Sequence, residues 1–182
     1  MEKIKFGLFS ILVLSLVVAG SFATLAEGRE FMTQRVPDLL VVDLRAKDGP
    51  FERWFDQVGG ELRPQPRLVV LARTLHDPEL LDALRRGADG YALAGQAPGR
   101  LIDVFEEVLG GRSTMAPEIA RRLQMHFAQH KATGTPLIDD TEQQLLQWVS
   151  TGYGLDDIAR GMHTTPGRLG VQVRALYRKL RF

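Results

Sequence analysis

The residues best suited to chemistry lie on the last helix that the sequence predicts, and that chemistry is contact with nucleic acid. Thr165 can cap this helix, and Pro166 can occupy its first position. Arginine side chains there can donate hydrogen bonds to phosphates and to base edges. From Thr164 to Phe182 the chain has five basic residues and no acidic ones, namely Arg168, Arg174, Arg178, Lys179 and Arg181. The alternative interpretation is a solvated basic face on a small helical bundle.

The same helix divides into two faces. Apolar residues recur at spacings of three and four, which predicts one buried stripe made by Leu169, Val173, Leu176 and Leu180. The opposite face should then present Arg168, Val171, Arg174, Ala175 and Arg178. A short helix at 155–161 and a tight connection at 162–164 come first. This order is typical of a helix-turn-helix, whose second helix enters the major groove of DNA.

Other kinds of chemistry have little support in the sequence. The chain has no cysteine, which excludes disulfides, thiolate nucleophiles and cysteine-ligated zinc. His126 and His130 are four apart on a predicted helix, but no third ligand is near them in the sequence, so a solvated face is the more frequent explanation. No glycine-rich phosphate loop and no Ser/His/Asp spacing is present. We therefore expect no enzyme, no metal, no cofactor and no small-molecule substrate.

The elements that must position the last helix fall into two halves. The chain has 182 residues with a net charge of +1, so any basic surface must come from local clustering. Apolar runs at 39–42, 68–71 and 91–93 alternate with predicted helices at 27–35, 51–58, 79–86 and 99–109. This alternation predicts a parallel sheet with helices on its faces. A helix at 117–130 leads to a polar linker at 131–136, and the remainder is predicted to be all-helical, beginning with a helix that Asp139 or Asp140 caps.

At this point the residues resemble a known family. The C-terminal segment resembles the LuxR-type helix-turn-helix of NarL/FixJ-class response regulators, through Glu142, Leu146, Gly152, Ile158, Ala159, Gly167, Arg168, Leu169, Val173, Leu176, Lys179 and Leu180. The segments at 37–44, 83–91 and 111–120 resemble the receiver domain of the same family. The resemblance implies a flavodoxin-like receiver followed by a DNA-binding domain, with Asp43 at the phosphoacceptor position. We expect a degenerate receiver at 1–121, a linker at 122–136 and the helix-turn-helix domain at 137–182.

The sequence departs from the family pattern where phosphoryl transfer takes place. Residues 6–26 contain no acidic pair that could hold Mg²⁺ with Asp43. The hydroxyl position falls on Ala72 and the lysine position on Ala94. We therefore expect a regulator that does not depend on phosphorylation. Gly170 stands where relatives often carry a basic residue, which weakens the helix by up to about 1 kcal/mol.

The N-terminus allows three interpretations. Lys3 and Lys5 precede an uncharged run at 6–26, a pattern typical of a signal peptide or a membrane anchor within residues 1–26. A buried strand or helix of a shortened α/β core also gives such a run. A membrane span with these flanking charges would place the C-terminus outside the cytoplasm, where a DNA-binding domain has no use. We therefore favour the buried core and a cytoplasmic location.

The sequence as a whole predicts a sequence-specific DNA-binding transcription regulator that binds double-stranded DNA. The residues expected to contact DNA are Thr165, Arg168, Val171, Gln172, Arg174, Arg178 and Lys179. The chain ends before the fourth helix through which the family's DNA-binding domains usually dimerise, so a homodimer or a heterodimer would depend on the receiver-like half. The first alternative is an interaction module that pairs with another regulator and binds DNA weakly or not at all, and the second is an exported or anchored protein.

Overall fold

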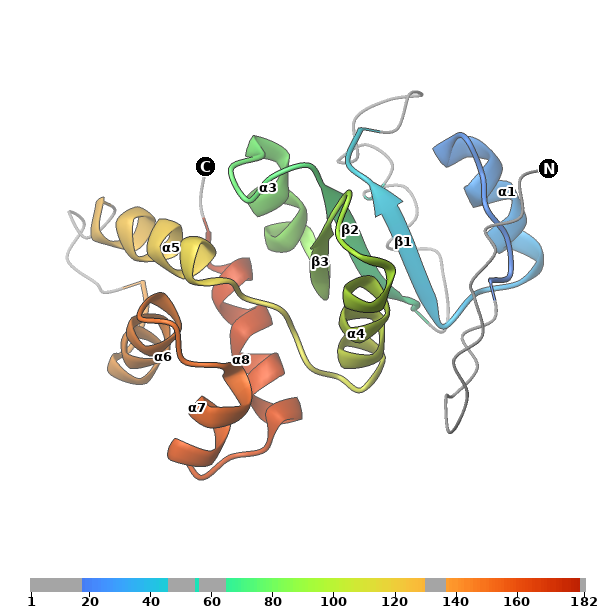
Figure 1. The fold of residues 1–182 in the computed structure, drawn as a ribbon. Helices are drawn as coiled ribbons and strands as arrows, with labels where there is room; N and C mark the ends of the chain where they lie inside the picture. The colour runs from blue at the N-terminus through green and yellow to red at the C-terminus, as the bar shows by residue number, and fades with distance from the viewer. Residues whose placement is uncertain (1–17, 46–54, 56–64, 130–136, 181–182) are drawn as a thin grey trace.

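The computed structural model describes residues 18–45, 55, 65–129 and 137–180 (Figure 1). Most of the predicted helix at 51–58, the linker at 131–136 and residues 6–17 lie outside this description. The elements in chain order are α1 (Leu25–Gln34), β1 (Leu39–Asp43), β2 (Arg67–Ala72), α3 (Pro78–Arg86), β3 (Gly90–Leu93), α4 (Pro98–Leu109), α5 (Pro117–Gln129), α6 (Asp140–Ser150), α7 (Leu155–Gly161) and α8 (Pro166–Arg178).

The three strands form the predicted parallel sheet, in the order β1-β2-β3. Val41 lies opposite Val69, and Leu71 lies opposite Ala92. Side chains alternate between the two faces of β2, as a pleated strand requires. Val69 packs with α4 on one face, whereas Leu68 and Val70 belong to the core on the face of α3. The expected α/β arrangement is therefore confirmed for the described strands.

Local signals in the sequence account for the ends of the helices. Asp77 accepts a hydrogen bond from the backbone N–H of Glu79 at 3.2 Å, and Gly87 ends α3 with a φ of 126°. Asp139 begins α6 with a capping box that includes Glu142. The prediction for the first helix was wrong by two residues, because Thr24 and Glu27 form a capping box that starts α1 at Leu25.

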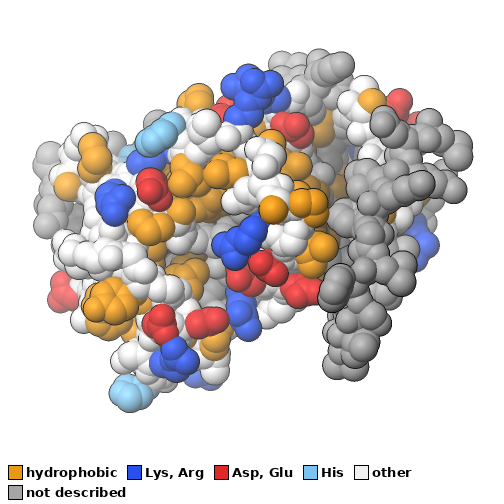
Figure 2. Space-filling model, in the orientation of Figure 1, with side chains coloured by type: hydrophobic (Ala, Val, Ile, Leu, Met, Phe, Trp, Pro, Cys, Tyr) orange, Lys and Arg blue, Asp and Glu red, His pale blue; other side chains and the backbone are white. Residues whose placement is uncertain are grey.

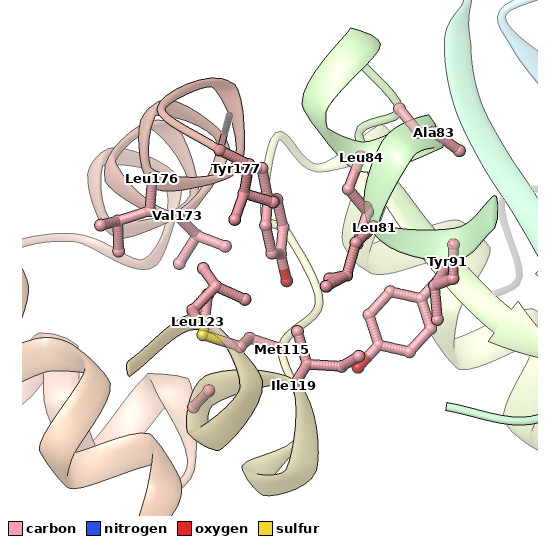
Figure 3. Packing of buried hydrophobic residues seen from close by; sticks show 14 of the residues in the cluster. Leu81, Ala83, Leu84, Tyr91, Met115, Ile119, Leu123, Val173, Leu176 and Tyr177 are labelled. Carbon is pink, nitrogen blue, oxygen red and sulfur yellow. The ribbon is translucent and has the colours of Figure 1, made fainter. Parts of the chain in front are cut away.

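The helices after α4 pack against one another and against the sheet half. The core between α5 and α6 contains Ile119, Leu123, Leu145 and Leu146, all nearly inaccessible to solvent. This core is continuous with Leu81 and Leu84 of α3 (Figure 3). The predicted boundary at residue 121 falls inside α5, so it remains a prediction rather than a division visible in the packing. Among the described residues, no helix has the length and apolar character needed to cross a bilayer.

Candidate nucleic-acid interface

Helices α7 and α8 with their connection form the predicted helix-turn-helix. Ile158 and Ala159 of α7 and Leu169 of α8 are buried in the same core, which sets the packing of the two helices. The connection is tight, with the Thr164 N–H donating to the Ala159 carbonyl at 2.9 Å and His163 at a φ of 52°. Thr165 caps α8 by accepting a hydrogen bond from the backbone N–H of Arg168.

One face of α8 is exposed as expected. Arg168 and Arg178 are exposed, and Val171 keeps 59% of its surface accessible despite being apolar. The spacings of three and seven residues place these side chains on one side of the helix. Two cations and one branched apolar side chain on a single helix face can contact phosphates and the apolar parts of base edges.

Arg174 does not share this exposed face, so its predicted position is wrong in this structure. It is 9% exposed, and its Nη1 donates to the carbonyl oxygens of Gly111 and Arg112, each at 3.1 Å. Its Nε lies 3.7 Å from a carboxylate oxygen of Asp89. The reason is that α8 packs against α3 and against the turn after α4, a contact that helical periodicity alone does not reveal.

Three residues of α8 make this contact, and we call Gly170, Arg174 and Tyr177 the docked face. A Cβ at position 170 would lie 2.7 Å from the Gly111 carbonyl oxygen and 2.9 Å from the Arg112 Cα. Glycine therefore allows the helix to approach a backbone more closely than any other residue would. The Tyr177 hydroxyl donates to the Thr114 carbonyl at 2.6 Å. The sequence analysis assigned Gly170 only a cost, and the structure supplies its use.

Electrostatics and burial at the docked face follow from these contacts. Burial lowers the pKa of Arg174, an effect that the Asp89 carboxylate partly opposes. Complete burial of Tyr177 raises the pKa of its phenol well above the ordinary value. Beside the docked face, Arg112 pairs with Asp156 of α7 at 3.4 Å. Figure 2 shows charged side chains of both signs close together on this side of the molecule.

Two further predicted contact residues, Gln172 and Lys179, are partly buried. The Lys179 Nζ lies 2.6 and 2.7 Å from the two carboxylate oxygens of Glu142, which joins the end of α8 to the start of α6. The Gln172 Oε1 is buried and has no hydrogen-bond partner among the described residues. Neither side chain lies on the exposed face that carries Val171.

Asp43 lies at the carboxyl edge of the sheet, where the resemblance assigns a phosphoacceptor. It is exposed, and one carboxylate oxygen accepts the Arg45 N–H at 2.9 Å. Ala72 ends β2, and Ala94 directly follows β3, with the Ala94 N–H donating to the Ala72 carbonyl at 2.8 Å. Thus the two positions assigned to a hydroxyl and an ammonium carry methyl groups. In the described part of the chain, no three His, Cys, Asp or Glu side chains are placed to hold a metal.

Sequence reasoning missed the residues that receive the docked face. Asp89 accepts hydrogen bonds from Arg67 at 3.0 Å and from the Leu68 N–H at 2.9 Å, in addition to its pairing with Arg174. Tyr91 is nearly buried, and its hydroxyl accepts the Ala116 N–H at 2.7 Å. The Gly110-Gly111 pair predicted a turn, but no pattern in the sequence indicated that α8 would lie on it.

The parallel sheet followed by a helix-turn-helix is similar to the arrangement of LuxR-type response regulators, and comparisons with known proteins give the same likeness. No model of a known protein family matches the chain. The response regulator VraR of Staphylococcus aureus is 24% identical over 181 residues, which cover 98% of this chain and 86% of VraR. VraR of Staphylococcus epidermidis is 25% identical over 158 residues, covering 85% and 75%.

Solved structures agree with this fold class. A structure of two RcsB dimers bound to two parallel DNAs matches with a TM-score of 0.51 and 16% identity, covering 91% of this chain and 80% of that one. At this identity the likeness concerns the fold alone. The likeness covers both the parallel sheet and the helical half that follows it.

Proposed function

We propose that the protein is a sequence-specific DNA-binding transcription regulator. The observation that carries this proposal is the exposed face of α8, where Arg168, Val171 and Arg178 project from the second helix of a helix-turn-helix. Similarity to the response regulator VraR over 98% of the chain supports it. RcsB, whose fold is similar, has been solved as dimers on DNA, and we extend double-stranded DNA and dimerisation to this chain as part of the proposal.

The residues have distinct roles in this proposal. Arg168 and Arg178 contact phosphates or base edges, and Val171 contacts a thymine methyl group. Arg174 reads bases only once the docked face has left the turn at 111–112, because in the docked arrangement its guanidinium is buried against the Gly111 and Arg112 carbonyls. Thr165, Gln172 and Lys179 support the interface from the ends and the flank of α8, where they are engaged or partly covered.

The input to this regulator is proposed to differ from phosphoryl transfer at Asp43. The methyl groups of Ala72 and Ala94 cannot hydrogen-bond or neutralise a phosphoryl group, which supports regulation without phosphorylation. Access to chromosomal DNA requires a cytoplasmic location, which we include in the proposal.

The test is binding of the full chain to a pool of randomised duplexes at two salt concentrations. We expect enrichment of one sequence, with affinity that falls as salt rises through counterion release. Arg178→Ala should weaken binding, whereas Arg160→Ala is the matched control, since Arg160 is an exposed arginine on α7 that pairs with Asp157. Absence of binding at both salt concentrations would refute the proposal.

The docked face favours a second candidate, a module that pairs with another regulator. With Gly170, Arg174 and Tyr177 engaged internally, α8 presents fewer groups to DNA than the helix could offer. In this case the chain would remove a second LuxR-type regulator from its DNA when the two are mixed. The randomised pool separates the candidates, because only the first predicts enrichment by this chain alone.

A further inference from the structure

The described residues leave part of one sheet face uncovered. Successive side chains of β1 point to opposite faces, as in any strand. Val42 belongs to the core on the face of α3 and is 4% exposed. Its neighbour Val41 points to the face of α4, where it lies opposite Val69, and is 37% exposed. We call Val41 and the half-buried Leu39 and Leu71 beside it the open sheet face.

The core on this face is incomplete. Helix α4 packs against β2 and β3 (Figure 1), and its sheet-facing side chains Leu101, Val104 and Phe105 remain half-buried. On the opposite face, Leu80 and Leu84 of α3 are 0% and 1% exposed. Protein interiors are close-packed and have few gaps. Large apolar side chains that face a sheet and stay half-buried therefore indicate that a further apolar segment belongs on the face of α4.

The uncharged run at 6–26 does not continue as one helix. Residues 18–22 have no regular secondary structure, and Thr24 begins α1 with a capping box. At most the twelve residues at 6–17 can therefore form a helix ahead of this irregular stretch. Twelve residues rise about 18 Å in a helix, whereas the hydrocarbon core of a bilayer is about 30 Å thick. Apolar segments of this length are more typical of a protein core than of a membrane span.

Residues 6–17 have the composition and the place in the chain that the open sheet face requires. Nine of these twelve residues are Phe, Leu, Ile or Val, and none is charged. Residues 18–24 lead from them into α1, which lies beside β1 (Figure 1). Met32 of α1 packs in the same core as Val42 of β1. The run therefore joins the described structure at the edge of the sheet that carries the open sheet face.

We propose that residues 6–17 bind to the open sheet face of their own chain and complete the core beside α4. Their large apolar side chains exclude water from Leu39, Val41 and Leu71, and removal of apolar surface from water is the main force that holds a core together. The proposal assigns the uncharged run to the interior of the protein, rather than to a bilayer or to a second copy. It does not depend on DNA binding by the chain.

The direct test is the rate at which a single thiol at position 41 reacts with a maleimide in the purified full chain, without lipid. The chain has no cysteine, so Val41→Cys supplies the only thiol. We expect it to react about tenfold more slowly than Tyr153→Cys, because a covered thiol reacts only when its contact opens. Tyr153 is the control, since it is 60% exposed between α6 and α7. Equal rates at the two positions would overturn the proposal.

Charges placed in the run test whether residues 6–17 are the cover. The pair Leu12→Asp and Val13→Asp occupies adjacent positions, so at least one of the two side chains meets the covered side. Together they should raise the rate at position 41 to that of Tyr153→Cys. Val18→Asp with Ala19→Asp is the matched control, because both positions are exposed, and it should leave the rate slow. A thiol at Ala83, which is 0% exposed in the opposite core, should stay slow in both pairs if the fold is retained.

Two further conditions separate the other occupants of this face. A slow rate at position 41 that is the same at every protein concentration supports cover by the chain's own residues. A rate that rises on dilution would assign the cover to a second copy and overturn the proposal. A rate that becomes slow only with vesicles of phosphatidylethanolamine and phosphatidylglycerol would assign the run to a lipid surface, which would also overturn it.

Discussion

Replacing Gly170 with alanine adds one methyl group where α8 lies closest to the turn after α4. That methyl carbon would lie 2.7 Å from the Gly111 carbonyl oxygen and 2.9 Å from the Arg112 Cα, both of them backbone atoms that cannot rotate away. Forcing an extra methyl group into a packed contact typically costs about 1–3 kcal/mol. We therefore expect Gly170→Ala to weaken the docked arrangement by about this amount.

The helix itself should gain from the same change. Alanine is favoured over glycine inside a helix by about 1 kcal/mol, so the helix-turn-helix should stay folded. A shift of about 1–3 kcal/mol toward the undocked arrangement frees Arg174 and corresponds to a change of about 5- to 150-fold in population. If most molecules are docked at the start, affinity for the selected duplex should rise by a similar factor.

Gly167→Ala provides the control for this prediction. Gly167 lies in the first turn of the same helix, and a Cβ there would meet no atom within 4 Å. The assay is a duplex-binding titration together with the denaturant midpoint of each variant. Equal effects of the two substitutions on duplex affinity would refute the role that the structure gives to Gly170.

Three further predictions concern α8, the turn before it and the sheet residues beside it. Arg174→Ala should lower the free energy of unfolding of the full chain by about 1.5–3 kcal/mol, since the guanidinium donates to two carbonyls. It should also flatten the sequence preference in the randomised pool. An unchanged denaturant midpoint would contradict the role of Arg174 in docking, and an unchanged preference would contradict its role in reading bases. Burial raises the pKa of both Tyr91 and Tyr177, so the unfolded chain releases these protons first. Their contribution to stability should therefore be constant below about pH 10 and fall above it by about 1.4 kcal/mol per pH unit for each group. Urea unfolding of Tyr177→Phe should show about half of that slope, with exposed Tyr153→Phe as the control, and a slope equal to that of wild type would argue against burial of Tyr177. His163→Gly should raise the free energy of unfolding by up to about 1 kcal/mol, seen as a higher denaturant midpoint, because a φ of 52° strains a residue with a Cβ. A lower midpoint would show that the imidazole contributes more to stability than the backbone strain costs.

Much of the local structure could be predicted because its causes are local. The Asp77-Pro78 and Thr165-Pro166 pairs predicted where α3 and α8 begin, since a cap and a proline act on their own turn. The apolar run at 68–71 predicted a buried strand, and β2 extends it by one residue at each end. The first helix began earlier than expected because its N-cap, Thr24, lies inside the uncharged run at 6–26, and its capping-box partner Glu27 is the first residue after that run.

The candidate site could be predicted only in part. Periodicity separated the buried stripe of Leu169, Val173 and Leu176 from the rest of α8, and these residues are indeed buried. Periodicity could not show which of the remaining α8 residues face solvent and which contact another part of the chain. Arg168 and Arg178 proved exposed, whereas Arg174, between them on the same polar side, proved buried. The roles of these residues in binding DNA remain predictions.

The sequence by itself determined the strands, the caps of α3, α6 and α8, the helix-turn-helix and the loss of polar groups at positions 72 and 94. All of these depend on neighbours within a few residues or on the identity of one side chain. Only the tertiary structure decided that α8 lies against the turn at 111–114, since that contact joins residues about sixty positions apart. It depends on the absence of a Cβ at Gly170 and on carbonyl groups directed at Arg174 and Tyr177. Backbone groups of this kind carry no signature in the amino-acid sequence, because every residue has them.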